Sequence, residues 1–139
     1  MLSFEIKTHQ IGRTYSNPHF FILNKGQNSG KPLEQPCPNC FVIITTSEEV
    51  KNNLYHLTMM LQLGQYFSYC LKGSVIPFIT KNDCSKIINK AFNMNNLILK
   101  KQLKTMQILN QKEAEYLFLL QKIQQLKLAY IKGAFKKMI

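Results

Sequence analysis

The sequence predicts an α+β fold: a small, mostly antiparallel sheet with a packed helix, followed by a long C-terminal helix or helical hairpin. Three observations lead to this fold class. Three short segments rich in β-forming residues lie within residues 1–46. A helix-start signal follows at Ser47. From Leu97 onward, no glycine or proline occurs before Gly133.

The strands are predicted from two kinds of pattern. Near the N-terminus apolar and polar residues alternate, with Leu2, Phe4 and Ile6 on one face, as in a half-buried strand. Residues 19–24 and 40–46 are continuous apolar runs, and each predicts a further strand. A fourth strand is expected over 74–79, where Pro77 favours a position at a sheet edge.

The first helix is expected over residues 48–71. Ser47 is its predicted N-cap, and the two glutamates that follow complement the helix dipole. Gly64 weakens the middle of this helix and could divide it, and Gly73 is its expected stop.

Asp83 is expected to cap a short helix over 84–91, and the polar residues 93–96 then break the chain. The sequence thus divides into a mixed α/β domain, residues 1–92, and a long basic helix, residues 97–139.

The long helix carries an imperfect apolar stripe, with gaps near Asn110 and Gln124. Such a stripe is poorly buried in an isolated helix. We therefore expect it to pack on the domain or to pair with a second copy in antiparallel orientation, as a homodimer. The stripe consists of Leu99, Leu103, Met106, Leu109, Leu117, Leu120, Leu128, Ile131 and Phe135.

The chain is strongly basic, with 18 lysines and arginines against 7 acidic residues and a net charge of +11. Arg13 is the only arginine, and residues 100–139 hold nine lysines and two glutamates. Lysine suits phosphate backbones better than bidentate base reading. The charge favours a polyanionic partner, with nucleic acid ahead of a membrane surface; a lysine-rich surface that only contacts solvent is the alternative.

The cysteines, at 37, 40, 70 and 84, do not form the pattern of a disulfide framework. The N-terminus is charged within its first seven residues, unlike a secretory signal, and no apolar run approaches the ~18 residues of a membrane span. We therefore expect a cytoplasmic protein with reduced thiols and no membrane partner.

The loop between residues 24 and 40 contains two patterns typical of functional sites. Gly26, Gly30 and Lys31 look like a phosphate loop, but the two glycines are one residue too close and Pro32 replaces the required hydroxyl residue. No helix follows to face a phosphate. We therefore do not predict a nucleotide site.

The second pattern is Cys37-Pro38-Asn39-Cys40. A redox motif would sit at a helix start, but this one runs into a predicted strand. A structural zinc site needs four ligands, and Cys70, Cys84, His19 or His56 would have to complete it. The favoured interpretation is a turn stiffened by proline, with the cysteines packed as small apolar residues, so no metal or other cofactor is predicted.

No catalytic residues are predicted. The three histidines are scattered, Asp83 is the only aspartate, and no nucleophile lies near a base in the sequence. We therefore expect a protein that is not an enzyme.

Residues 20–87 resemble the target-recognition domain of type I restriction-modification specificity subunits, and with the long helix the likeness covers roughly residues 20–139. That family has a strand, a "GxxGK" loop, a second strand, a helix with a "YL" pattern and a "GS…P.I…D" segment. The matching residues here are Gly26, Ser29, Gly30, Lys31, Leu54, Tyr55, Gly73, Ser74, Pro77, Ile79 and Asp83.

The resemblance implies a non-catalytic module that binds duplex DNA. The helix from Leu97 would then match the family's spacer helix and would contact a methyltransferase or another protein subunit. Lysines would position the protein on phosphates, whereas Arg13, Gln27 or Asn28 would read bases. The predicted DNA-binding residues are Arg13, Lys25, Gln27, Asn28, Ser29, Lys31, Lys72, Ser74 and Lys81.

Two alternatives remain open. The chain could be a small basic accessory factor of a mobile element, whose helix binds an acidic protein surface while DNA affinity is incidental. It could also be a small zinc-dependent domain built on Cys37 and Cys40.

Overall fold

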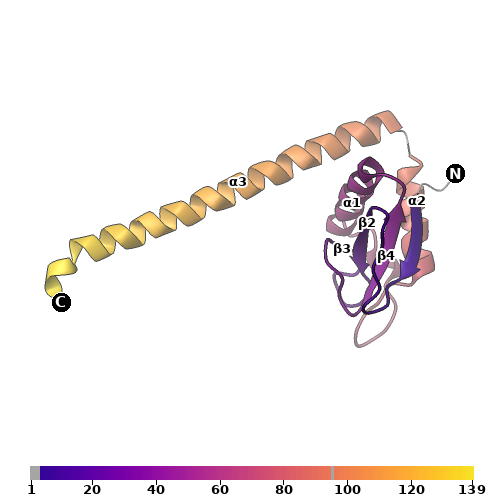
Figure 1. Ribbon diagram of the computed structural model, residues 1–139, viewed down its shortest axis with the longest axis horizontal. Coiled ribbons are helices and arrows are strands. Elements are labelled where there is room, and N and C mark those ends of the chain that lie inside the picture. Colours follow the sequence, from indigo (N-terminus) through magenta and orange to yellow (C-terminus); the bar gives the residue numbers. More distant parts are fainter. Residues whose placement is uncertain (1–3, 95) are drawn as a thin grey trace. The chain divides into compact units, whose positions relative to one another are not determined.

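The computed structural model describes residues 4–94 and 96–139, and it confirms the α+β fold class. Four strands, β1 (Phe4–Thr8), β2 (His19–Leu23), β3 (Pro32–Leu33) and β4 (Cys40–Thr45), form one sheet in the order β1-β4-β2-β3. Every neighbouring pair is antiparallel (Figure 1). The three strands predicted within residues 1–46 are therefore confirmed, although Leu2 lies outside the described residues. The short strand β3 was not predicted.

The sequence of β4 explains its central position. Its residues are apolar almost without a break, and alternate side chains enter two different apolar clusters. Phe41 and Ile43 join the larger cluster, beneath the helices, whereas Val42 joins a smaller one on the opposite face. A strand that is buried on both faces needs this continuous apolar run.

Helices α1 (Glu48–Leu63) and α2 (Lys81–Phe92) lie beside the sheet (Figure 1) and supply the other half of the larger cluster. Leu54, Leu57 and Ile88 are buried there against the strands. On the opposite face the connection between β1 and β2 covers Phe21, with the His9 ring in edge contact at 5.0 Å.

Helix α1 is shorter than predicted. Ser47 is its N-cap, as expected, and accepts a hydrogen bond from the Val50 amide at 3.2 Å. The helix ends at Leu63, and the residue with positive φ that follows is Gln65, at 63°. A short 3-10 helix then covers Ser68–Cys70. The predicted extent to residue 71 is therefore wrong, because the chain leaves helical conformation just after Gly64.

The strand predicted over 74–79 is also wrong. Lys72 and Phe78 exchange two backbone hydrogen bonds, of 2.8 and 2.9 Å, and these bonds close a loop instead. Gly73 lies within that loop with φ +92°, so it serves the turn and does not stop a helix. Pro77 has no amide to donate, and its carbonyl accepts from the Gly26 amide.

Helix α2 begins earlier than expected. Its N-cap is Thr80, whose hydroxyl accepts from the Asp83 amide at 3.2 Å. Asp83 is therefore a residue of the first turn and not the cap, which corrects the predicted start at residue 84. The helix ends at Phe92 with Asn93 as its C-cap, within the predicted polar break; residue 95 of that break lies outside the described residues.

Helix α3 (Asn96–Ala134) is one continuous helix, so the hairpin alternative is wrong, and a 3-10 turn at Lys136–Met138 follows it. By internal packing the chain divides into two compact units, Met1–Leu103 and Lys104–Ile139. Leu103 is buried in the large apolar cluster, so the first turns of α3 belong to the first unit. The predicted division into residues 1–92 and 97–139 stays a prediction. Over the described residues, none of the helices has the length and apolar character to span a membrane.

Candidate nucleic-acid interface

One end of the sheet gathers several of the predicted DNA-binding residues. Because β1 and β2 both run antiparallel to β4, they end where β4 begins: Thr8 lies opposite Phe41 and Leu23 lies opposite Cys40. The segment before α2 reaches the same end, since the Ile79 amide donates to the Asn24 carbonyl at 3.0 Å. Loops from three separate parts of the chain therefore meet there.

Three lysines surround Phe78 at this end, and we name Lys25, Lys72 and Lys81 the lysine cluster. Lys25 and Lys72 each form a backbone bridge with Phe78. Lys81 is the first residue of α2 and lines an open pocket of about 440 Å³ together with Lys25. None of the lining residues is acidic: they are Thr8, Asn24, Lys25, Phe41, Phe78, Ile79, Thr80 and Lys81.

The three lysines differ in their ionic partners. The Lys72 Nζ lies 3.6 Å from the Asp83 Oδ2, and the Lys72 side chain is 58% exposed. Among the residues that the structure describes, Lys25 and Lys81 form no ion pair. Their charges are thus available to an anion from solution. The N-terminus of α2, capped by Thr80, adds a positive dipole end beside Lys81.

The acidic residues Glu48 and Glu49 lie away from this end. They follow β4 directly, after Thr45, whereas the lysine cluster lies beside the residue at which β4 begins, Cys40. These two glutamates, one of which is ion-paired with Lys51 at 3.7 Å, therefore lie at the other end of the sheet from the lysine cluster.

The glycine-containing turn between β2 and β3 is a packed structural element. Gly26 and Gly30 have φ of +98° and +100°, and the Ser29 hydroxyl donates to the Gly26 carbonyl at 2.7 Å. Ser29 is only 3% exposed, so its hydroxyl holds the turn and does not face solvent. Gln27, Asn28 and Lys31 are exposed on the same turn.

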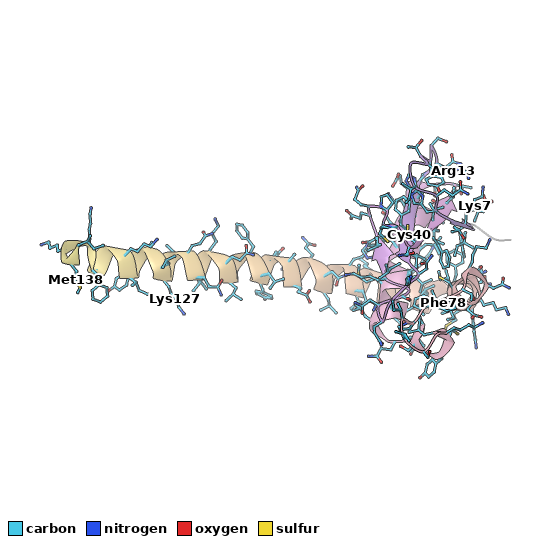
Figure 2. The ribbon with its side chains drawn as sticks, turned by 90° about the horizontal axis from the view of Figure 1, so that it is seen from below. Lys7, Arg13, Cys40, Phe78, Lys127 and Met138 are labelled. Atoms are coloured by element: carbon cyan, nitrogen blue, oxygen red, sulfur yellow. The ribbon has the colours of Figure 1, made fainter. Side chains whose placement is uncertain are left out.

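Two other predicted contact residues lie outside the lysine cluster. Arg13 is exposed in the β1–β2 connection, and Figure 2 shows it well separated from Phe78. Ser74 is exposed in the loop that Lys72 and Phe78 close. Leu54 and Tyr55, which carry the family resemblance on α1, pack in the interior: Leu54 is buried, and the Tyr55 ring meets the Phe20 ring edge-on at 5.4 Å.

The Cys37–Cys40 segment forms a turn that leads into β4. The Cys40 thiol donates to the Cys37 carbonyl at 3.1 Å, and the Cys37 thiol to the Asn39 carbonyl at 3.4 Å. Burial raises the pKa of the Cys40 thiol, so a metal-binding thiolate is disfavoured. Over the described part of the chain, three or more histidine, cysteine, aspartate or glutamate residues nowhere gather to hold a metal ion.

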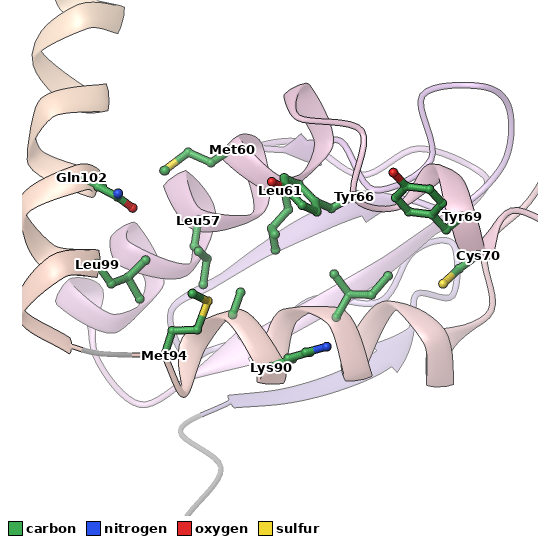
Figure 3. Close-up of a pocket in the computed structure, with 12 residues that line it drawn as sticks. Leu57, Met60, Leu61, Tyr66, Tyr69, Cys70, Lys90, Met94, Leu99 and Gln102 are labelled. Carbon is green, nitrogen blue, oxygen red and sulfur yellow. The ribbon is translucent and has the colours of Figure 1, made fainter.

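The first unit also contains an apolar pocket of about 620 Å³, which the sequence did not reveal. Figure 3 shows Leu57, Met94 and Leu99 converging on it from α1, the segment after α2 and the start of α3. Lys90 lies at its edge, nine residues and roughly 13 Å along α2 from Lys81. The pocket is therefore a different surface from the lysine cluster.

Two residues of the lysine end were missed by sequence reasoning. Phe78 was assigned to a strand, and nothing local indicates that it would join Lys25 to Lys72. Thr80 had a readable signal, because a threonine three residues before an acidic side chain is a capping pattern.

The fold is thus a small helix-covered antiparallel sheet with lysines at one end. Residues 6–133 match a family of unknown function, DUF6943, and the chain belongs to this family. Neither a curated protein nor a solved structure matches it. The resemblance to restriction-modification target-recognition domains therefore stays a prediction.

Proposed function

We propose that this protein is a non-catalytic DNA-binding module that acts like a target-recognition domain. The observation that carries the proposal is the lysine cluster, in which Lys25, Lys72 and Lys81 converge from three separate segments on one end of the sheet. Lysine is a flexible point charge that suits phosphate oxygens, and phosphate contacts fix the position of a protein on a duplex.

Base reading is assigned to the exposed turn beside Lys25. Gln27 and Asn28 stand on this turn with their side chains exposed. Their amides have the donor and acceptor pair that reads adenine in the major groove. Lys31 follows on the same turn and supplies another phosphate contact. Arg13, in the β1–β2 connection, would contact the duplex at a separate place.

We also propose that the protein acts in the cytoplasm. A DNA-binding protein with four free thiols fits the reducing cytoplasm. The partner is duplex DNA, and α3 offers a surface to a methyltransferase or another protein subunit, or to a second copy.

The test compares two double variants that each remove two exposed positive charges. Lys25→Gln with Lys81→Gln changes the lysine cluster, and Lys127→Gln with Lys132→Gln changes α3. Binding of a fluorescent duplex is measured by anisotropy between about 50 and 200 mM salt. The cluster variant should bind more weakly, and its plot of log affinity against log salt should be shallower by about one unit for each phosphate that it no longer neutralises.

The α3 variant should keep the slope of the unchanged protein, because its lysines act only at long range and salt screens them within about 10 Å at 0.1 M. If the slope becomes shallower in the α3 variant and stays unchanged in the cluster variant, the proposal is wrong.

A second candidate function is a protein-interaction factor, such as an accessory protein of a mobile element. It is favoured by the large apolar side chains exposed along α3, among them Leu126 and Tyr130. DNA binding that is equally weak in both double variants, and absent at about 150 mM salt, would favour this candidate.

A further inference from the structure

The apolar positions of α3 repeat every eleven residues. Met106 is followed by Leu117 and Leu128, and the same interval relates Leu109, Leu120 and Ile131. Eleven residues make three turns of 3.67 residues each, close to the natural period of an α-helix, so these positions stay on one face along the helix. We name this face the seam: Met106, Leu109, Glu113, Leu117, Leu120, Gln124, Leu128 and Ile131.

The seam is uncovered within its own unit. Five of its apolar side chains, from Leu109 to Ile131, are between 50% and 54% exposed. A single helix cannot bury these groups against itself, and most helical stability in water comes from packing an apolar face. The seam is therefore an apolar face that a second helix would bury.

The spacing of the seam allows the partner to be an antiparallel copy. The intervals between its successive members are 3, 4, 4, 3, 4, 4 and 3 residues, which read the same in both directions. In an antiparallel pair Met106 then meets Ile131, Leu109 meets Leu128, and Leu117 meets Leu120. The remaining two members, Glu113 and Gln124, meet each other, so each apolar side chain faces an apolar one.

Charge distinguishes this register from a parallel pair. In a parallel pair each Glu113 would face Glu113 of the second copy across the seam, and the two like charges would repel. In the antiparallel register the Gln124 amide donates to the Glu113 carboxylate, so this pair of polar residues carries one charge and no repulsion.

We infer that residues 104–133 pair with the same residues of a second copy, antiparallel and in this register. The paired stretch is 30 residues, about 45 Å long. The inference is independent of DNA binding, since it uses the apolar and charged residues of α3 alone.

Disulfide crosslinking tests the register. The background carries Cys37→Ser and Cys70→Ser, which remove the two half-buried thiols, while Cys40 and Cys84 stay buried. Chains with Glu113→Cys are mixed with chains with Gln124→Cys and oxidised mildly. The mixture should form a crosslinked dimer, and each variant alone should not. A crosslink with Glu113→Cys alone would indicate a parallel pair and overturn the inference.

A matched control uses the opposite face of the helix. Gln111→Cys mixed with Leu126→Cys satisfies the same antiparallel pairing, because 111 and 126 stand at the same level, but both positions point away from the seam. This mixture should stay uncrosslinked, and crosslinking as fast as the seam mixture would show unspecific contact.

Sedimentation then measures the association itself. The unchanged protein should be a dimer at micromolar concentration, and Leu120→Gln should weaken it by about 100-fold or more, since each dimer contains that layer twice. Leu126→Gln, off the seam, should leave the dimer intact. A strict monomer for the unchanged protein, or loss of the dimer only with Leu126→Gln, would overturn the inference.

Discussion

Gly30 lies against the aromatic ring of Phe67. A β-carbon placed on Gly30 would come within 2.6 Å of the ring Cγ and 2.8 Å of Cε2, and Phe67 is only 1% exposed. The turn between β2 and β3 is thus pressed onto the segment that follows α1. The glycine that resembles part of a phosphate loop is required here by packing.

Gly30→Ala should destabilise the fold by roughly 3 kcal/mol or more, because it combines a strained backbone with a collision against a buried ring. Gly26→Ala is the matched control: its φ is +98°, but its β-carbon would meet no atom within 4 Å. Gly26→Ala should lower the free energy of unfolding only by the cost of a positive φ at an alanine, about 1–2 kcal/mol. Urea unfolding measures both, and equal losses would show that the Phe67 contact contributes nothing.

Local patterns predicted the strands and the start of α1 because the responsible residues are neighbours in sequence. The continuous apolar run of β4 indicates burial on two faces, and Ser47 followed by two glutamates indicates a helix start. These features need no knowledge of distant residues.

The sequence-based predictions are wrong where the local structure depends on contacts between residues far apart in the chain. Residues 74–79 are apolar enough for a strand, yet the Pro77 carbonyl is taken by Gly26 and the Phe78 backbone by Lys72. The candidate interface also depends on contacts between residues far apart in the chain. Single lysines were named from the sequence, but their convergence around Phe78 depends on three loops that meet only in the folded chain.

Thr80→Ala should cost about 1 kcal/mol of stability, because the first turn of α2 loses the side-chain acceptor for the Asp83 amide. Thr80→Ser keeps the hydroxyl and should stay near the stability of the unchanged protein. Urea unfolding of the two variants side by side makes the comparison. A serine variant as unstable as the alanine variant would indicate that the missing methyl group, and not the cap, is responsible.

The four cysteines should separate into two classes by their reactivity toward a thiol reagent. Burial raises the pKa of the Cys84 thiol to about 12, and burial also raises that of Cys40. Since the thiolate is the reactive form, both should label at least about 100-fold more slowly in the native protein than in urea. Cys37 and Cys70 are half-buried and should label first. Mass spectrometry of timed samples assigns each site, and early labelling of Cys84 would contradict its burial.

The stability of the protein should fall on acidification through the range in which His56 titrates. Burial lowers the pKa of His56, whose Nδ1 is buried and has no hydrogen-bond partner among the described residues. In the unfolded chain a histidine has a pKa near 6.5, so below roughly that pH the unfolded state binds more protons than the folded state. The contribution of His56 to the free energy of unfolding is therefore greatest above about pH 6.5, and it decreases as the pH falls toward the lower pKa of the folded state.

His56→Gln removes the titrating group, and His9 and His19 stay in both proteins. Urea unfolding at a series of pH values from about 7.5 to 5 should therefore show a decline that is smaller in the variant. The difference between the two proteins should itself shrink or reverse toward acid, because the unchanged chain then has to exclude a proton from a buried ring nitrogen. An identical decline in both proteins would assign the acid sensitivity to other groups.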